Sequence, residues 1–219
     1  MVEFGFYALP VIMLFVGLVL ISYAPNTSKT RVWFTLIIVV WEIYVLFLSK
    51  AGLLDTSFFP PRIPLLLMLP ALVIIIIGTG TKRFKHIIKQ IPPHLLIYAQ
   101  SFRIIVELLI FGAFLNGIFP EQVTFEGTNF DVLAGISAIP MGYLVQKGKI
   151  DKKGILVWNV ICLLLLMTAI GSFVYSYYLT ETPFVSQEFV SAPYVYLAGF
   201  LAPMAVFFHV LSIRQQLSK

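Results

Sequence analysis

Three charged side chains interrupt stretches that are otherwise apolar, where lipid would surround them if the stretches cross a membrane. Glu42 lies within Trp33–Leu48, and Arg103 and Glu107 lie within His94–Ile118. On a rise of 1.5 Å per residue, Glu42 and Arg103 are each roughly 13 Å from one end of their helix, and Glu107 is roughly 20 Å deep. A charge at the bilayer centre costs on the order of 3 kcal/mol. We therefore expect all three to face the interior of a helix bundle and to find partners.

The chemistry that these residues predict is proton binding beside an ion pair. Gln100, Arg103 and Glu107 follow i, i+3, i+7 spacing and so share one face of a helix. We expect Arg103 to pair with Glu42 or Glu107. Because two carboxylates then face one guanidinium, one carboxylate is left to bind a proton. Two interpretations stay open: a ligand pocket, or an ion pair that only fixes the register of the helices.

Other polar residues extend this site in both directions. Gln100, Asn159 and His209 are each predicted roughly 6–9 Å from the cytoplasmic end of their helices. The preferred interpretation of His209 is that it satisfies carbonyls in the last turn of its helix. Asp131 ends the sequence Thr128-Asn129-Phe130-Asp131, which resembles a capping box, and we favour a helix cap over a ligand contact for it.

A stripe of small residues follows Asp131 along the same helical face. Gly135, Ala138 and Gly142 come four, seven and eleven residues after it. Small residues in this pattern allow another helix to approach closely. The stripe is therefore also a candidate surface for a homo-oligomer.

The elements that must position these residues are hydrophobic helices. The chain of 219 residues is 59% hydrophobic and 11% charged, against about 25% charged in soluble domains. Helices are expected because unpaired backbone groups are costly in hydrocarbon. Runs such as Ile74–Ile77 do not alternate as barrel strands do. The predicted fold is an all-α, seven-transmembrane-helix bundle in a single domain, with spans Phe4–Ser22, Trp33–Leu48, Ile63–Gly78, His94–Ile118, Asp131–Gln146, Gly154–Tyr178 and Pro193–Ile213.

The loops between these spans alternate in charge. Twelve of the fifteen Lys and Arg residues, including Lys219, come after the first, third, fifth and seventh spans. The positive-inside rule places them in the cytoplasm, with the N-terminus outside and the C-terminus inside. The net charge of +5 is explained by these loops. Membrane lipids are therefore the expected partners, and nucleic acid is not.

Several kinds of chemistry are not expected, because the residues that they require are missing from the sequence. The last predicted span, Pro193–Ile213, holds no lysine for a retinal Schiff base. His86, His94 and His209 share no ligand spacing with one another, so no metal site is predicted. The chain has no P-loop and no GxSxG motif. We assign no cofactor and no catalytic residue.

Four short motifs in the second half of the chain resemble those of uncharacterised bacterial seven-helix inner-membrane proteins. The motifs run from Phe102 to Glu107, from Phe125 to Asp131, over Trp158-Asn159, and from Pro203 through His209 to Gln215. The resemblance implies the same topology and a bacterial inner-membrane location, but no activity.

Three functions are weighed against one another. The first is a protein that binds or carries a small molecule or a lipid at Glu42, Arg103 and Glu107, with Gln100, Asp131, Asn159 and His209 around them. The second is a structural or accessory subunit without a ligand. The third is an intramembrane enzyme that modifies a lipid. For the third, Asp131 and His209 are the only extra candidates, and their predicted places at opposite membrane faces argue against it.

Overall fold

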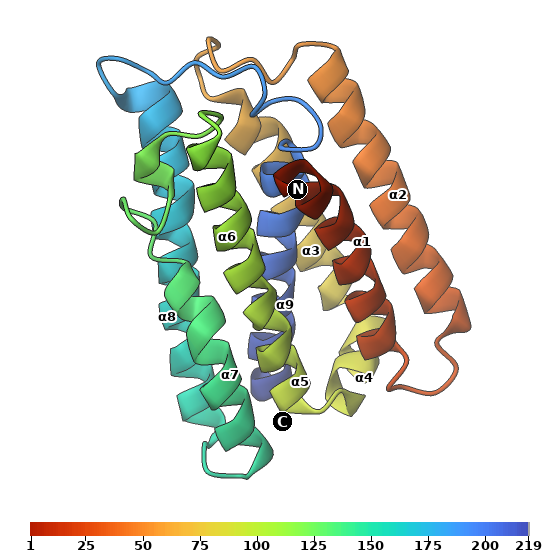
Figure 1. Cartoon of the computed structure of the whole chain (residues 1–219). Coiled ribbons are helices and arrows are strands. Elements are labelled where there is room, and N and C mark those ends of the chain that lie inside the picture. The colour runs from red at the N-terminus through yellow and green to blue at the C-terminus, as the bar shows by residue number, and fades with distance from the viewer. Residues whose placement is uncertain (219) are drawn as a thin grey trace.

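The computed structural model describes residues 1–218, and over that range the chain forms helices and no strand. Successive long helices run back and forth along one direction (Figure 1). Lys219, counted above among the cytoplasmic basic residues, lies outside the described range. The helices are α1 (Val2–Ile21), α2 (Ser28–Lys50), η1 (Pro64–Met68), α3 (Leu69–Gly80), α4 (Lys82–Gln90), α5 (Pro93–Tyr98), η2 (Ala99–Ser101), α6 (Phe102–Leu115), η3 (Glu121–Val123), α7 (Val132–Gln146), α8 (Lys152–Val174), η4 (Tyr175–Leu179), η5 (Leu197–Leu201) and α9 (Ala202–Leu217).

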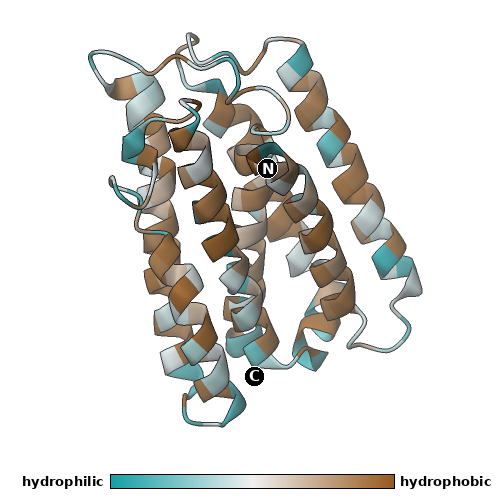
Figure 2. Ribbon diagram, in the orientation of Figure 1, coloured by the Kyte–Doolittle hydropathy of each residue, from teal (hydrophilic) through white to brown (hydrophobic). Residues whose placement is uncertain are grey.

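All seven predicted segments are largely helical, and five helices are long and apolar enough to cross a membrane. The five are Val2–Ile21, Ser28–Lys50, Pro93–Leu115, Lys152–Leu179 and Leu197–Leu217. The segment Pro64–Gly80 reaches the required length only together with α4, and α7 is a shorter apolar helix. Figure 2 shows the apolar residues along the helix shafts and the polar ones mainly near the ends. Over residues 1–218 the chain is therefore all-helical, with five candidate membrane-spanning helices.

The helix α4 was not predicted, because its sequence is too short and too basic to stand out by hydrophobicity. It is bent by 79° from the segment before it. The hydroxyl of Thr81 caps it by accepting a hydrogen bond from the backbone N–H of Phe84 (3.3 Å). Ile87 and Ile88 are buried, whereas its lysines are exposed. This distribution is typical of an amphipathic helix that lies at a membrane surface.

The helices differ greatly in burial. Most residues of α9 are buried, and its neighbours surround it (Figure 1). In α2, by contrast, only Thr30, Val45 and Leu48 are buried. The rest of α2 exposes large apolar side chains, including Trp33 and Ile43. Such a helix is suited to a lipid environment on most of its surface.

The small-residue stripe on α7 is covered within the same chain. A Cβ atom on Gly135 would lie 2.8 Å from the backbone nitrogen of Ile104, and one on Gly142 would lie 2.6 Å from the ring of Tyr98. Ala138 is fully buried. The stripe thus allows α7 to pack closely on α5 and α6. The helices that pack on the stripe belong to the same chain, so the stripe is buried and does not form an exposed surface.

Candidate functional site

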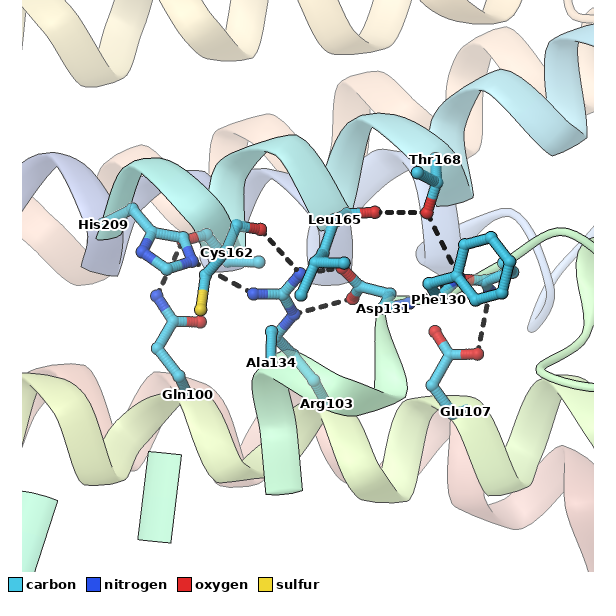
Figure 3. A network of polar contacts seen from close by, with 12 residues as sticks. Gln100, Arg103, Glu107, Phe130, Asp131, Ala134, Cys162, Leu165, Thr168 and His209 are labelled. Carbon is cyan, nitrogen blue, oxygen red and sulfur yellow. Dashed lines mark hydrogen bonds and ion pairs between the residues drawn. The ribbon is translucent and has the colours of Figure 1, made fainter. Parts of the chain in front are cut away.

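Arg103 is the centre of a buried polar network (Figure 3). Its side chain is 1% exposed. The Nε–H donates to Oδ2 of Asp131 (2.6 Å), and Nη2 forms an ion pair with Oδ1 of the same carboxylate. Among residues 1–218 this is the only salt bridge. The two-point contact is the geometry in which guanidinium and carboxylate bind most strongly.

The predicted partners of Arg103 are therefore wrong: it pairs with Asp131, not with Glu42 or Glu107. The close approach of α7 to α6 at Gly135 brings the two side chains together. Asp131 occupies the N-cap position of α7, but its carboxylate accepts no hydrogen bond from the first turn. The favoured interpretation of Asp131 as a helix cap is thus also wrong, because Arg103 takes up both carboxylate oxygens.

Glu42 stands apart from this network. It lies on α2, at the edge of the bundle, and makes no salt bridge among the described residues. Its Oε1 atom is buried without a hydrogen-bond partner in that range. Its assignment to a cluster with Arg103 and Glu107 is not supported by the fold.

His209 contacts the other side of the guanidinium. Its Nε2 lies 3.0 Å from Nη1 of Arg103, and its Nδ1 lies 2.8 Å from Oδ1 of Asn159. Because a guanidinium can only donate, Nε2 must accept, and Nδ1 must carry the proton and donate to Asn159. This assigns a neutral imidazole. The prediction that His209 satisfies last-turn carbonyls is wrong, because α9 continues to Leu217 and the ring points into the bundle.

Asp131 and His209 had been expected at opposite membrane faces, but both contact Arg103. The long arginine side chain spans the distance between them along the bundle. The depth of a residue's backbone in the membrane therefore does not predict where the end of a long side chain lies. The third nitrogen, Nη2, also donates to the carbonyl oxygen of Cys162 (3.3 Å) on α8.

Asn159 and Gln100, which were predicted at the same depth as His209, are also buried. Asn159 donates from Nδ2 to the hydroxyl of Ser212 (2.9 Å), which joins α8 to α9. Gln100 donates from Nε2 to the carbonyl of Ala205 (3.1 Å) on α9. Of these three residues, His209 and Asn159 therefore contact each other. Gln100 instead binds a backbone carbonyl, and its Oε1 has no hydrogen-bond partner among the described residues.

Glu107 has no cation within salt-bridge distance in the described chain. It is 1% exposed, and its Oε2 accepts a hydrogen bond from Nδ2 of Asn129 (2.8 Å). The same amide donates to the carbonyl of Val123 (2.9 Å), and its oxygen accepts from the backbone N–H of Asp131 (3.0 Å). Oε1 of Glu107 makes no hydrogen bond to residues 1–218. Sequence reasoning missed Asn129 as a site residue, although its place two residues before Asp131 suits a turn that hydrogen-bonds its own backbone.

A cavity of about 80 Å³ lies beside this network. Arg103, Glu107 and Asp131 form its polar wall, and the rest is almost entirely apolar. The lining includes residues from all three π-helical segments, η1, η4 and η5, or from positions next to them. Short π-helical turns inside helices occur frequently at functional sites. The apolar and aromatic part of the lining includes Val106, Ile110, Leu166, Phe173, Tyr178, Phe189 and Leu197.

The chemistry available here is ion pairing, hydrogen bonding and proton binding. In the described range, no group of three His, Cys, Asp or Glu residues is placed to hold a metal ion. The hydroxyl of Thr168 on α8 accepts a hydrogen bond from the backbone N–H of Phe130 (3.1 Å), which fixes the turn before α7. That turn in turn fixes Asn129 and Asp131. Four helices, α6 to α9, thus hold one network in place.

Comparison with known proteins gives one family match. One family model, described as Domain of unknown function (DUF8737), matches residues 60–217. No curated protein and no solved structure matches the chain. The matched range contains the whole network around Arg103 and leaves out α1, α2 and Glu42. Because the match covers more than half of the chain, the protein belongs to the DUF8737 family.

Proposed function

We propose that the chain crosses a bacterial inner membrane seven times, with the N-terminus outside and the C-terminus in the cytoplasm. The start of α2, the helix α4, the turn between α7 and α8 and the end of α9 all carry basic residues. In Figure 1 these segments lie at the lower end of the bundle. Basic loops at one end favour that end as cytoplasmic. On this topology α7, although short, is a span, and α4 lies at the cytoplasmic surface.

Within this bundle, the chain binds or carries a small molecule at the cavity beside Glu107. The observation that carries this proposal is the charge balance of the site. Arg103 is neutralised by Asp131, and the contacts of His209 assign it a neutral ring. Glu107 is left without a cation, although it is buried and its Oε1 is free to accept a hydrogen bond. An unpaired carboxylate in an apolar interior is costly unless it binds a proton or a positive group.

The shape of the cavity limits the ligand. Sites for drug-sized ligands typically have volumes of about 300–1,000 Å³, whereas this cavity has about 80 Å³. The ligand class that fits is a short apolar molecule with a cationic or hydrogen-bond-donating end. A larger ligand would need the helices to separate at the π-helical segments. A cation and a proton then compete for the carboxylate of Glu107. A proton-coupled carrier requires this kind of competition.

A second candidate is a structural subunit in which the network only registers the helices. The observation that favours it is that each of the three side-chain nitrogens of Arg103, Nε, Nη1 and Nη2, already has a partner within the protein. The two candidates differ in what they require of Glu107. A structural role requires the Glu107 side chain only for folding, whereas ligand binding requires its carboxylate to contact the ligand.

The test uses Glu107→Gln, which keeps an oxygen for Asn129 but cannot be charged. The probes are butylamine and butyrate, which match in length and differ in charge, and the measurement is the binding isotherm in detergent at several pH values. Wild-type protein should bind butylamine and not butyrate. Binding should weaken as the pH falls, because protons compete for Glu107. A hydrogen bond to a charged group contributes about 1.5–3 kcal/mol, so Glu107→Gln should bind about 10- to 100-fold more weakly and without pH dependence.

The matched control is Glu126→Gln, which removes an exposed carboxylate on the loop before α7. It should bind as the wild type does. If butylamine and butyrate bind equally, or if Glu107→Gln binds the amine as the wild type does, the carboxylate is not the binding group. Loss of folding in Glu107→Gln, seen as aggregation on size-exclusion chromatography, would instead favour the structural candidate.

A further inference from the structure

A larger cavity lies on the other side of the bundle, away from the Arg103 network. It measures about 320 Å³ and is lined by α2, α3, the start of α4, η5 and α9. Most of its wall is apolar or aromatic, with Phe34 on α2 and Phe200 and Phe207 on the floor. Figure 1 shows α2 standing apart from α3. The cavity is a groove between these helices, and none of the residues discussed above for Glu107 lines it.

The groove has the length of one leaflet. Along α2 its lining runs from Thr30 to Trp41, which at 1.5 Å per residue is roughly 16 Å. The hydrocarbon core of a bilayer is about 30 Å thick, so the groove covers about half of it. Trp41 closes the deep end, where its Nε1–H donates to the carbonyl of Gly199 (2.6 Å). The groove therefore starts at the basic end of the bundle and stops near the middle.

The polar groups of the groove gather at its basic end. Arg83 is exposed on α4 and contributes to the lining. Thr30 is only 8% exposed, and its Oγ1 atom is buried without a hydrogen-bond partner among residues 1–218. A buried hydroxyl without a partner costs roughly 1–3 kcal/mol. A bound molecule that offers an acceptor at this height would remove that cost.

We propose that the groove binds an anionic phospholipid of the cytoplasmic leaflet. One acyl chain lies along the groove as far as Trp41, an ester carbonyl accepts a hydrogen bond from the hydroxyl of Thr30, and the phosphate lies against Arg83. Charge complementarity selects the headgroup, since α2 begins with Lys29 and Arg31, and α4 adds further cations at the same end. Basic residues at a membrane surface attract anionic lipids by about 1 kcal/mol each. The lipid also completes the packing of α2, which the protein itself covers poorly.

The test is native mass spectrometry of the whole protein released from micelles that contain equal amounts of phosphatidylglycerol and phosphatidylcholine. The wild type should retain one phosphatidylglycerol in preference to phosphatidylcholine. Arg83→Gln should reduce that preference about fivefold, which corresponds to about 1 kcal/mol. Thr30→Val should weaken retention of both lipids about two- to tenfold. Lys50→Gln, an exposed change at the opposite end of α2 and outside the groove, is the control and should behave as the wild type does.

A substitution at one glycine can fill the groove itself, and a second glycine offers a matched control. Gly78 lines the groove, Gly171 on α8 does not, and a Cβ atom on either would meet nothing within 4 Å. Gly78→Leu should abolish lipid retention, whereas Gly171→Leu should leave it unchanged. The proposal is overturned if both lipids are retained equally, or if Arg83→Gln, an exposed change that leaves folding intact, keeps the full preference. Displacement of the lipid by free glycerol phosphate would overturn it too, since the acyl chain would then not matter.

Discussion

Replacing Asp131 by asparagine should destabilise the fold far more than any other single acid-to-amide change. The wild-type carboxylate holds Arg103 through Oδ2 at 2.6 Å from Nε and through a second contact at Oδ1. Asparagine keeps the size of the side chain but removes the charge and one acceptor. The guanidinium would remain buried, at 1% exposure, with only the neutral ring of His209 and the carbonyl of Cys162. Breaking a buried pair in this way typically costs about 3–5 kcal/mol.

The measurement is equilibrium unfolding in mixed micelles with increasing sodium dodecyl sulfate, followed by circular dichroism. Asp131→Asn should lower the free energy of unfolding by about 3–5 kcal/mol. The control is Asp151→Asn. Asp151 is exposed and caps α8 by accepting from the backbone N–H of Gly154 (2.9 Å), a role that asparagine performs equally well. Its change should be close to zero.

A second control separates Asp131 from the partner that the sequence predicted. Glu42 makes no salt bridge within the described residues, so Glu42→Gln should cost little. If Asp131→Asn costs less than about 1 kcal/mol, which is the range of an exposed pair, the ion pair does not hold the bundle together. If Glu42→Gln is the more costly change, Arg103 pairs with Glu42 and the observed arrangement of α6 and α7 is wrong.

Two further predictions concern topology and packing. Reporter fusions after Lys89 and after Lys152 should signal from the cytoplasm and a fusion after Glu121 from the outside, and a cytoplasmic signal at Glu121 would contradict seven spans. Gly135→Val should destabilise the protein by about 1–3 kcal/mol in the same unfolding assay, because its Cβ would lie 2.8 Å from the backbone nitrogen of Ile104. Gly171→Ala, with open space around it, should be neutral or stabilising by up to about 1 kcal/mol, and equal effects at both glycines would show that α6 and α7 do not touch there.

Part of the candidate site could be predicted from the sequence. Charge in an apolar stretch is costly, so Arg103 and Glu107 had to be buried inside the bundle, and both are 1% exposed. The partner of Arg103 could not be predicted from the sequence in the same way. Glu42 and Arg103 have equal predicted depth, but depth does not say which helices are neighbours. Asn129 was missed because it lies in a turn, where an amide is common for local reasons.

The helical fold and the long apolar helices follow from the sequence alone, because both depend on local composition and on the cost of unpaired backbone groups in lipid. The sequence also predicted seven segments that prove to be largely helical, whereas five helices are long and apolar enough to cross a membrane. Three features became clear from the three-dimensional arrangement: α7 packs on α6 through Gly135, Asp131 therefore pairs with Arg103, and α2 stays at the edge with Glu42. These outcomes depend on contacts between residues far apart in the chain. The helical pattern of each segment is compatible with several arrangements of neighbours, and the close packing of particular side chains selects one.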